Sequence, residues 1–496
     1  MLPYATLLHL DKTMATPLYV QLSEGLGQLI RAGTLSAGQR LPGTRLLASQ
    51  LDLNRQTIVA AYDDLLAQGI LESRAGSGTF VAGHMPNLTP QPFTNTQRTQ
   101  ARQSQSPTHS PVQQPGYSFE QRTYLKRAAA GSPSGLRFDD GLPDARLAPL
   151  DELSRAYRSY GKWGNPQAHF GYSDTKGHPL LREQVSAHLN ETRGLQITVD
   201  NVLITRGSIM GIHLACQVLL QPGDVVVTGE TTWAGATMNA QQAGARLVTV
   251  PVDAHGLNVD ALADLCAHQA VRMIYVTPHH HYPTTVTMRA DRRIRLLQLA
   301  QQHGFAILED DYDYDFHYLG RPILPLASAD SQGMVIYIGS LTKSVAPAFR
   351  VGYVVGPTAL IDEMARLRRI IDRQGDPALE FAIGQLFQSG DMKRHFRKAI
   401  RTYEARRDYL CGLLAHELPH QIQFSKPDGG LAIWATFDKD IDLPTVAERA
   451  GKAGLYLSPG VVHNLPGQLL NSTRLGFASS TEKELAQAVS MLKSLI

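Results

Sequence analysis

Six short apolar runs, separated by segments of helix length, constrain the fold of this chain more than any other feature of its sequence. The runs are rich in β-branched residues and extend over 202–204, 225–227, 247–250, 273–276, 306–308 and 335–338. Continuous apolar strands that alternate with helices predict a mainly parallel sheet covered on both faces, which is an α/β fold. Ligands of such sheets bind at the carboxyl ends of the strands, so functional residues are expected directly after the runs.

The first 83 residues follow another pattern, which is typical of a small helical domain. Apolar residues recur at helical spacing over 22–30, Thr44 can cap a second helix, and Asn54 can cap a third. Two strand candidates follow at 70–74 and 79–81, with a glycine-containing turn between them. Three helices and a hairpin predict a winged helix-turn-helix domain.

Residues 84–132 separate these two regions and are polar and repetitive, with few side chains that could fill a core. Such a composition is typical of a flexible linker. We therefore expect a winged-helix domain at 1–83, a flexible polar linker at 84–132 and a ligand-binding α/β domain at 133–496.

The composition of the 496 residues is that of a globular protein, with 43% hydrophobic and 18% charged residues. Cys216, Cys266 and Cys411 are far apart and odd in number, which argues against a disulfide framework or a clustered zinc site. A net charge of +3 is too small to indicate nucleic acid or membrane binding by itself. No stretch has the pattern of a signal peptide or a membrane span, so a cytoplasmic protein is expected.

The third helix of the winged-helix region offers residues suited to DNA. Arg55, Gln56 and Thr57 stand at its N-terminus, where backbone N–H groups favour phosphate and side chains can reach base edges. Arg45 and Arg74 can grip the DNA backbone. Basic and acidic residues are balanced in this region, and a helix-turn-helix can also serve protein contacts alone. DNA binding is the favoured hypothesis, and a protein-contact role is the alternative.

Polar residues that suit a phosphorylated pyridine aldehyde follow several of the predicted strands. Ser208 opens a helix after a glycine turn, where free N–H groups can cradle a phosphate. Asp310 and Tyr312 are two residues apart, so a carboxylate and a phenol can meet one flat ligand. Lys343 follows small hydroxyl residues, where a lowered pKa would favour a Schiff base, and Arg350 offers a bidentate phosphate fork.

Simpler interpretations compete with this one, since a lone lysine after a strand is usually a solvated charge. Asp310, Asp311, Asp313 and Asp315 could suggest calcium, but the run lacks the glycine and the glutamate of an EF-hand loop. The histidines at 279–281 could suggest a metal, but neighbours in an extended loop point in different directions, and no Cys or carboxylate is spaced to complete a site. We expect no metal site and interpret the histidines as loop residues that border the cofactor.

N-terminal motifs resemble the winged helix of the GntR family, namely residues 17–19, 40–45, 54–57 and 76–81. The resemblance implies that Arg45, Arg55 and Thr57 contact DNA, together with Gly78 at the wing tip. Gly43 stands where a serine is commoner in the family, which leaves one phosphate contact open.

C-terminal motifs at 308–316, 339–343 and 347–353 resemble fold-type I aminotransferases, and the chain as a whole resembles the MocR/GabR subfamily of GntR regulators. The resemblance implies pyridoxal 5′-phosphate (PLP), a smaller α+β subdomain beside the main sheet, and a head-to-tail homodimer. It assigns Lys343 to a Schiff base with PLP and Arg474 to the carboxylate of a substrate or effector, although Arg474 by itself could equally be a surface ion pair. The other implied cofactor contacts are Asp310 at the ring nitrogen, Tyr312 at the ring hydroxyl, Trp233 against the ring, and Ser208, Ser340 and Arg350 at the phosphate.

Some positions depart from the aminotransferase pattern. Ile209 replaces a common glutamine after the phosphate serine, and the turn from Tyr282 to Thr285 replaces one of Asn-Pro-Thr-Gly type. One usual hydrogen bond to the ring hydroxyl is then missing, and the turn must avoid a geometry open only to glycine. Cofactor binding is expected to survive, and efficient transamination is left open.

Two functions are compatible with the sequence. The favoured one is a transcription regulator that binds paired half-sites on DNA and senses an amino compound, or PLP itself, through its aminotransferase-like domain. The alternative is a working aminotransferase that acts on an amino acid.

Overall fold

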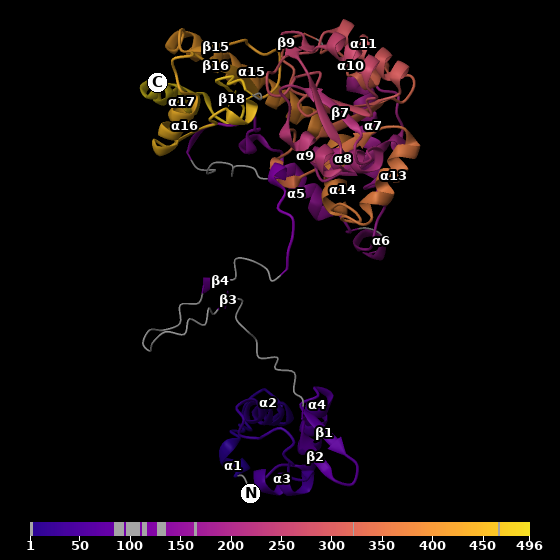
Figure 1. Cartoon of the computed structure of the whole chain (residues 1–496), viewed down its shortest axis with the longest axis vertical. Coiled ribbons are helices and arrows are strands. Elements are labelled where there is room, and N and C mark those ends of the chain that lie inside the picture. Colours follow the sequence, from indigo (N-terminus) through magenta and orange to yellow (C-terminus); the bar gives the residue numbers. More distant parts are fainter. Residues whose placement is uncertain are drawn as a thin grey trace. The chain divides into compact units, whose positions relative to one another are not determined.

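The computed structural model describes residues 3–83, 94–95, 110–111, 117–125, 135–162, 166–320, 322–464 and 467–496. The chain divides into two compact units, residues 1–121 and residues 122–496. Figure 1 colours the first unit from indigo to purple and the second from purple to yellow. The expected linker at 84–132 lies largely outside the described residues; within it, β3 (Thr94–Asn95) pairs with β4 (Ser110–Pro111), and a short 3-10 helix spans Thr123–Leu125.

The N-terminal unit is a winged helix, as expected. Its helices are α1 (Tyr4–Leu7), α2 (Leu18–Arg31), α3 (Thr44–Leu51) and α4 (Arg55–Ala67), followed by an antiparallel hairpin of β1 (Leu71–Arg74) and β2 (Gly78–Val81). The helices and the hairpin share one core, in which the most deeply buried side chains include Leu22, Leu26, Leu47, Ile58 and Leu65.

The N-termini of α3 and α4 are capped differently. Asn54 accepts a hydrogen bond from the N–H of Gln56 at 2.9 Å, which confirms it as an N-cap. The prediction for Thr44 is wrong, because the extended residue before α3 is Gly43 and Thr44 is the first helical residue. The Thr44 hydroxyl instead accepts from Nε of Arg55 at 3.5 Å, which joins the N-termini of the two helices.

The second unit is built on a seven-stranded sheet with the order β6-β14-β13-β12-β11-β7-β8. The strands are β6 (Val202–Thr205), β7 (Val225–Gly229), β8 (Arg246–Val250), β11 (Met273–Val276), β12 (Ala306–Asp311), β13 (Val335–Ser340) and β14 (Gly352–Val355). All six apolar runs are strands of this sheet and, where they neighbour one another, they pair in parallel. Only β14 was not predicted, and it runs antiparallel to both of its neighbours.

Helices cover both faces of this sheet, as the sequence predicts. Alternate residues of β13 show the two faces, since Ile336 and Ile338 belong to one core while Val335 and Tyr337 belong to cores on the opposite side. The helices of the main subdomain are α5 (Leu150–Ser159), α6 (Pro166–Phe170), α7 (Pro179–Arg193), α8 (Ser208–Leu219), α9 (Ala234–Gln242), α10 (Val259–His268), α11 (Ala290–His303), α12 (Leu326–Ala329), α13 (Thr358–Arg368) and α14 (Pro377–Gln388), with a small hairpin of β9 (Val252–Asp253) and β10 (Gly256–Leu257).

A smaller α+β subdomain completes the unit (Figure 1). Its three-stranded antiparallel sheet contains β15 (Ile422–Phe424), β16 (Ala432–Phe437) and β18 (Ser472–Gly476), and β5 (Leu136–Phe138) pairs in parallel with β17 (Leu455–Leu457). Its helices are α15 (Asp391–Glu417), α16 (Leu443–Lys452) and α17 (Glu482–Leu495). In the described parts of the chain, no helix is both long and apolar enough to span a membrane.

Candidate functional site

A cavity of about 340 Å³ lies at the carboxyl ends of the strands of the large sheet. Its lining includes all seven residues for which the sequence implies cofactor contacts: Ser208, Trp233, Asp310, Tyr312, Ser340, Lys343 and Arg350. Residues separated by more than 140 positions in the chain thus meet around one space of a size typical of small-molecule sites. The individual contacts remain predictions.

One end of the cavity is suited to a phosphate. Ser208 is the first residue of α8, and the preceding Gly207 has a φ of +74°, so free N–H groups open toward the cavity at a helix N-terminus. A Cβ at Gly207 would lie 2.8 Å from a guanidinium nitrogen of Arg350, which shows that the arginine packs directly on the glycine. Arg350 itself has a φ of +51°, and such strained positions concentrate at binding sites.

Another part of the cavity lining presents a carboxylate that lacks one partner. Oδ2 of Asp310 accepts a hydrogen bond from the Tyr275 hydroxyl at 2.8 Å, whereas Oδ1 is buried and has no partner among the described residues. Burial raises the pKa of Asp310 to about 7. A protonated pyridine nitrogen would supply the missing donor and stabilise the charged carboxylate, so this part fits the ring of PLP.

Two further polar groups line the cavity. Nζ of Lys343 donates to the carbonyl of Gly141 at 2.6 Å, and burial lowers the pKa of this lysine. A lowered pKa increases the share of neutral amine, which is the form that attacks an aldehyde. The hydroxyl of Tyr312 donates to the carbonyl of His280 at 3.1 Å, and burial holds its pKa well above the ordinary value, so the phenol is a neutral donor.

Trp233 stands immediately before α9 and lines the same cavity. A Cβ at Gly235 would lie 2.5 Å from the indole ring, so only glycine lets the ring fold over the start of this helix. Ile209, which follows the phosphate serine, also lines the cavity and offers no hydrogen bond from its side chain.

Arg474 lies on β18 at the edge of this site and is only 3% exposed, so the alternative of a surface ion pair is wrong. Its Nη1 donates to the carbonyl of Pro283 at 3.0 Å, and its Nε lies 2.8 Å from Oδ1 of Asp140. Asp140 also accepts from the Tyr282 hydroxyl at 2.9 Å, and its side chain is 49% exposed. A buried guanidinium is therefore paired with an accessible carboxylate from the same chain.

The sequence did not identify Asp140 as a site residue. It follows β5, a strand of three residues that is too short to be recognised from an apolar pattern. The only local signal is the glycine after it, because Gly141 has a φ of +85° and a Cβ there would lie 3.1 Å from the guanidinium of Arg474.

The turn from Tyr282 to Thr285 differs from the expectation. Thr285 has a φ of +63°, in the left-handed region that favours glycine, and the Tyr282–Pro283 peptide is cis. The prediction that the turn avoids such a geometry is wrong. Hydrogen bonds hold it in place, since Thr285 N–H donates to the carbonyl of His281 at 2.7 Å and His281 N–H donates to that of Val286 at 2.8 Å.

The residues predicted to contact DNA lie on three elements of the N-terminal unit. Arg55, Gln56 and Thr57 form the first turn of α4, where the two longer side chains are exposed, and Arg45 is exposed in the first turn of α3. The hydrogen bond from Arg55 to Thr44 brings the starts of these helices together. This shared edge is the part of a helix-turn-helix that can enter a groove of DNA.

The other two predicted DNA contacts, Arg74 and Gly78, lie on the hairpin. Arg74 ends β1, donates from Nε to Glu72 at 3.0 Å and lies 4.5 Å above the ring of Phe80, so it is partly neutralised. Gly78 begins β2 with a φ of +112°, and a Cβ there would lie 3.2 Å from Nε of Arg40. Arg40 is exposed beside the wing and was not selected from the sequence, although it stands in the same motif as Arg45.

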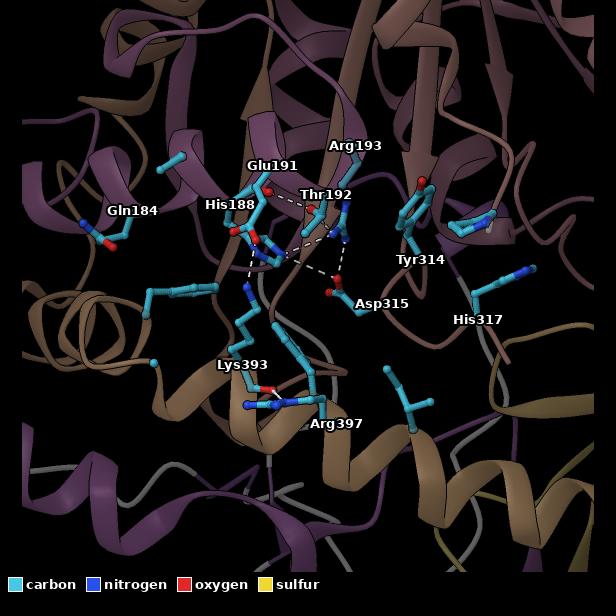
Figure 2. A pocket seen from close by; sticks show the side chains of 16 residues that line it. Gln184, His188, Glu191, Thr192, Arg193, Tyr314, Asp315, His317, Lys393 and Arg397 are labelled. Atoms are coloured by element: carbon cyan, nitrogen blue, oxygen red, sulfur yellow. Dashed lines mark hydrogen bonds and ion pairs between the residues drawn. The ribbon is translucent and has the colours of Figure 1, made fainter. Parts of the chain in front are cut away.

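A second cavity, of about 410 Å³, lies between α7 and α15 and contains none of the predicted site residues (Figure 2). Arg193 pairs with Asp315 at 2.7 Å inside it, and His188 lies 3.5 Å from the same carboxylate. Tyr314 and His317 also line it.

Comparison with protein families matches both units. Residues 142–492 match the family described as aminotransferase class I and II, and residues 18–81 match the bacterial regulatory proteins of the gntR family.

Individual relatives divide into two groups. The probable rhizopine catabolism regulatory protein MocR of Rhizobium meliloti is 29% identical over 491 residues, which cover 98% of this chain and 95% of that protein. Aromatic-amino-acid aminotransferase 1 of Thermococcus litoralis is 28% identical, over 72% of this chain and 86% of that protein. The crystal structure of Pyrococcus horikoshii kynurenine aminotransferase, in complex with PMP, superimposes with a TM-score of 0.70 at 27% identity and covers 76% of this chain and 96% of that one.

Proposed function

Because this chain belongs to the aminotransferase class I and II family and carries a gntR-family domain ahead of it, we propose that it is a PLP-dependent transcription regulator of the MocR type. The observation that carries this proposal is the extent of the matches. The regulator MocR is matched along 98% of the chain, whereas the aminotransferase is matched along 72%. An N-terminal DNA-binding domain is part of what a regulator needs, and residues 18–81 match such a domain.

PLP, when bound, supplies an electrophilic aldehyde on an electron-withdrawing ring. In this proposal Lys343 provides the amine for the aldehyde, Oδ1 of Asp310 accepts from the ring nitrogen, and Tyr312 donates to the ring hydroxyl. Trp233 covers one face of the ring, and Ser208, Ser340 and Arg350 bind the phosphate. The unpartnered oxygen of Asp310 and the helix N-terminus at Ser208 support this orientation.

The effector that we infer is an amino compound with a carboxylate, such as an amino acid. Its carboxylate would replace Asp140 at Arg474, and the fork of the guanidinium suits that exchange. Because Asp140 is 49% exposed, it can turn toward water when it is displaced, and its hydrogen bond with Tyr282 is then broken. Ligand binding would in this way rearrange a contact between the two subdomains.

We propose that DNA binds to the exposed edge formed by the starts of α3 and α4 and to the adjacent wing. Arg45, Arg55, Gln56, Thr57 and Gly78 are the proposed contacts, with Arg74 in a weaker role because Glu72 already pairs with it. We further propose a head-to-tail homodimer, which would place two winged helices on two half-sites of one operator.

A catalytically active aminotransferase is the second candidate, favoured by the complete set of cofactor residues around the cavity. Adding single amino acids and amines to the holoprotein, with Lys343→Ala as control, separates the two. A lasting shift of the cofactor absorption band without keto acid supports a sensor. Loss of the band with steady accumulation of keto acid would put the enzyme first.

A further inference from the structure

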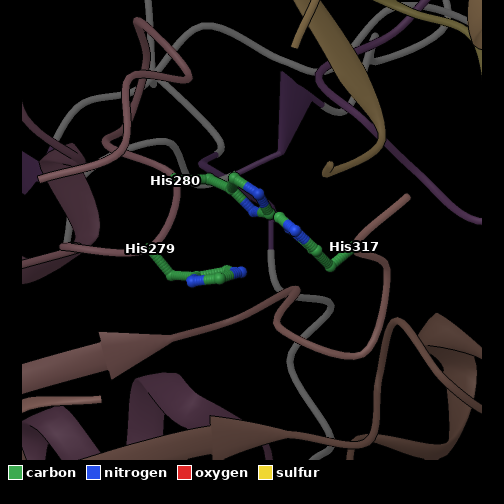
Figure 3. Close-up of side chains that lie close together, drawn as sticks. All are labelled: His279, His280 and His317. Carbon is green, nitrogen blue, oxygen red and sulfur yellow. The ribbon is translucent and has the colours of Figure 1, made fainter. Parts of the chain in front are cut away.

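Three histidines gather at the carboxyl ends of β11 and β12, outside the cofactor cavity (Figure 3). One possible ligand nitrogen from each of His279, His280 and His317 lies within 4.8 Å of the others. The ring centroids of His279 and His280 are 4.3 Å apart, and those of His279 and His317 are 5.5 Å apart. Contrary to the prediction that they point in different directions, the rings of His279 and His280 lie together, because the backbone bends at 279–280 instead of staying extended.

The nitrogens at the centre of this cluster lack partners. Both ring nitrogens of His279, Nε2 of His280 and Nδ1 of His317 are buried, and none has a hydrogen bond within the described ranges of the chain. His279 and His280 are only 3% and 2% exposed, so bulk water does not solvate them. Buried polar groups are normally satisfied, and a set of four unsatisfied nitrogens on three adjacent rings calls for a shared partner.

The opposite nitrogens of two of the rings are held by acceptors. Nδ1 of His280 donates to Oδ1 of Asp313 at 2.7 Å, and Nε2 of His317 donates to the carbonyl of Leu319 at 2.5 Å. These acceptors fix the proton on the outer nitrogen and leave a lone pair on the inner one. A carboxylate or a carbonyl behind a histidine is the usual support of a metal ligand.

We propose that His279, His280 and His317 bind a divalent late transition-metal ion such as Zn²⁺ or Co²⁺. Three imidazoles favour such ions over Mg²⁺ or Ca²⁺, which prefer oxygen. Metal–nitrogen bonds of about 2.0–2.1 Å require the rings to close on the ion by small rotations from their present spacing.

The surrounding charges allow a cation here. Asp313 contributes a carboxylate directly behind His280. The nearby arginines are already engaged, since Arg193 pairs with Asp315 at 2.7 Å and the guanidinium of Arg293 donates to three backbone carbonyls at 2.7–3.0 Å. Their charge is therefore partly offset before an ion enters.

The cavity in Figure 2 borders the cluster, and we place a fourth, water ligand on that side. His317 lines this cavity together with Tyr314, whose ring centroid lies 4.5 Å from that of His279. The Tyr314 hydroxyl is buried without a partner in the described part of the structure and could accept or donate to such a water. Three protein ligands and one open position are the arrangement of an accessible zinc site.

The site also touches the cofactor loop. The carbonyl of His280 accepts the hydrogen bond of Tyr312, which lines the cofactor cavity. An ion bound to the His280 ring would fix the residue that positions this phenol. A bound metal would thereby influence the proposed sensor through the position of Tyr312, without itself contacting the cofactor.

Cobalt binding to the full-length protein tests the site. Wild type is expected to bind one Co²⁺ per chain with the visible absorption of a low-coordinate cobalt centre. His317→Ala should weaken this binding about 100-fold or more, since even the loss of a supporting group costs 10–100-fold. His303→Ala, at an exposed histidine that ends α11, is the matched control and should bind as wild type does. Equal Co²⁺ affinity in the wild type and His317→Ala would overturn the proposal.

Crystals of the wild-type protein soaked in Zn²⁺ give a second measurement that does not depend on a variant. An anomalous peak at bonding distance from all three imidazoles is the expected result. Zinc found only on exposed histidines, or no ordered zinc, would refute the site. The absorption of bound PLP in His317→Ala shows independently whether that variant is folded, so failure of the metal site leaves the proposed regulator intact.

Discussion

The two units carry their candidate functional groups in opposite environments. In the winged helix, Arg45 and Arg55 are exposed, and among the described residues neither pairs with a carboxylate. In the aminotransferase-like unit, Asp310 and Arg474 are both 3% exposed and tied to neighbours. The contrast follows from the partners: a DNA backbone is met by charges that stay in water, whereas a small ligand must be recognised by groups whose charge is adjusted by burial.

This difference predicts that substitutions in the second unit alter chemistry that depends on pKa, while those in the first alter affinity that depends on salt.

Replacing Lys343 by alanine should give the largest effect. The covalent link to PLP is lost entirely, because no other amine lines the cavity among the described residues. The absorption spectrum of the purified variant would lose the band of lysine-bound cofactor, and effectors would no longer shift it. Lys452→Ala, at an exposed lysine of α16, is the control; a preserved band in Lys343→Ala would contradict the assignment.

Arg55→Ala should weaken operator binding by about 10–100-fold, the value of one good base or phosphate contact per winged helix. It should also reduce the salt dependence of binding, because the variant contacts fewer phosphates and so releases fewer counterions from the DNA when it binds. Gel-shift or anisotropy titrations at two salt concentrations would measure both. Arg31→Ala, an exposed arginine at the end of α2, serves as the matched variant. An unchanged affinity in Arg55→Ala would remove α4 from the DNA interface.

Asp310 offers a test through the pH dependence of the stability that PLP binding adds. Its pKa is raised from 3.8 to about 7, so the cofactor-free protein loses stability as pH rises through that range, where the unfolded chain is already charged. A ring cation would favour the charged carboxylate, so the gain in Tm on PLP binding should be larger at pH 7.5 than at pH 5. Asp310→Asn should reduce the free energy by which PLP stabilises the protein by about 1.5–3 kcal/mol, the value of a hydrogen bond to a charged group. A pH-independent gain would show that Asp310 does not meet the ring.

Thr285→Gly should have the smallest effect and the opposite direction. A left-handed β-branched residue costs about 1–2 kcal/mol, and part of the gain is offset because glycine is more flexible when unfolded. A net stabilisation of about 0.5 kcal/mol is expected in denaturant unfolding. Thr284→Gly is the neighbouring control, since no positive φ is recorded there. A loss of stability in Thr285→Gly would mean that the threonine side chain makes a contact that outweighs the strain.

The sequence predicts the large sheet well because its parallel strands are buried on both faces and read as continuous apolar runs. β14 is as long as β6 and β11, but it was not predicted because it runs antiparallel to both neighbours and so stands outside the alternation of parallel strands and helices. The strand-end positions of the proposed cofactor residues followed from the same sheet. Asp140 did not, because β5 comes from a part of the chain far from β18 in sequence and reaches Arg474 only through the fold.

The other predictions that proved wrong concern local backbone geometry. Thr44 was expected to cap α3, but an extended Gly43 starts the helix one residue earlier. The rings of His279 and His280 were expected to diverge, yet a bend brings them together and His317 joins them from another strand end. Neither a single bend nor a one-residue shift of a helix leaves a periodic pattern that could reveal it beforehand.

The 27-residue helix α15 gives the second unit a stiff lever. At a rise of about 1.5 Å per residue it is roughly 40 Å long. Lys393 and Arg397, near its start, line the cavity between α7 and α15, whereas Leu410 and Leu414 near its end are packed into the core under the sheet that carries Arg474. A tilt of about 5° at one end of such a rod moves the other by about 3 Å. A small shift of the three-stranded sheet around an effector would therefore become a larger displacement at the start of α15, on the opposite side of the unit.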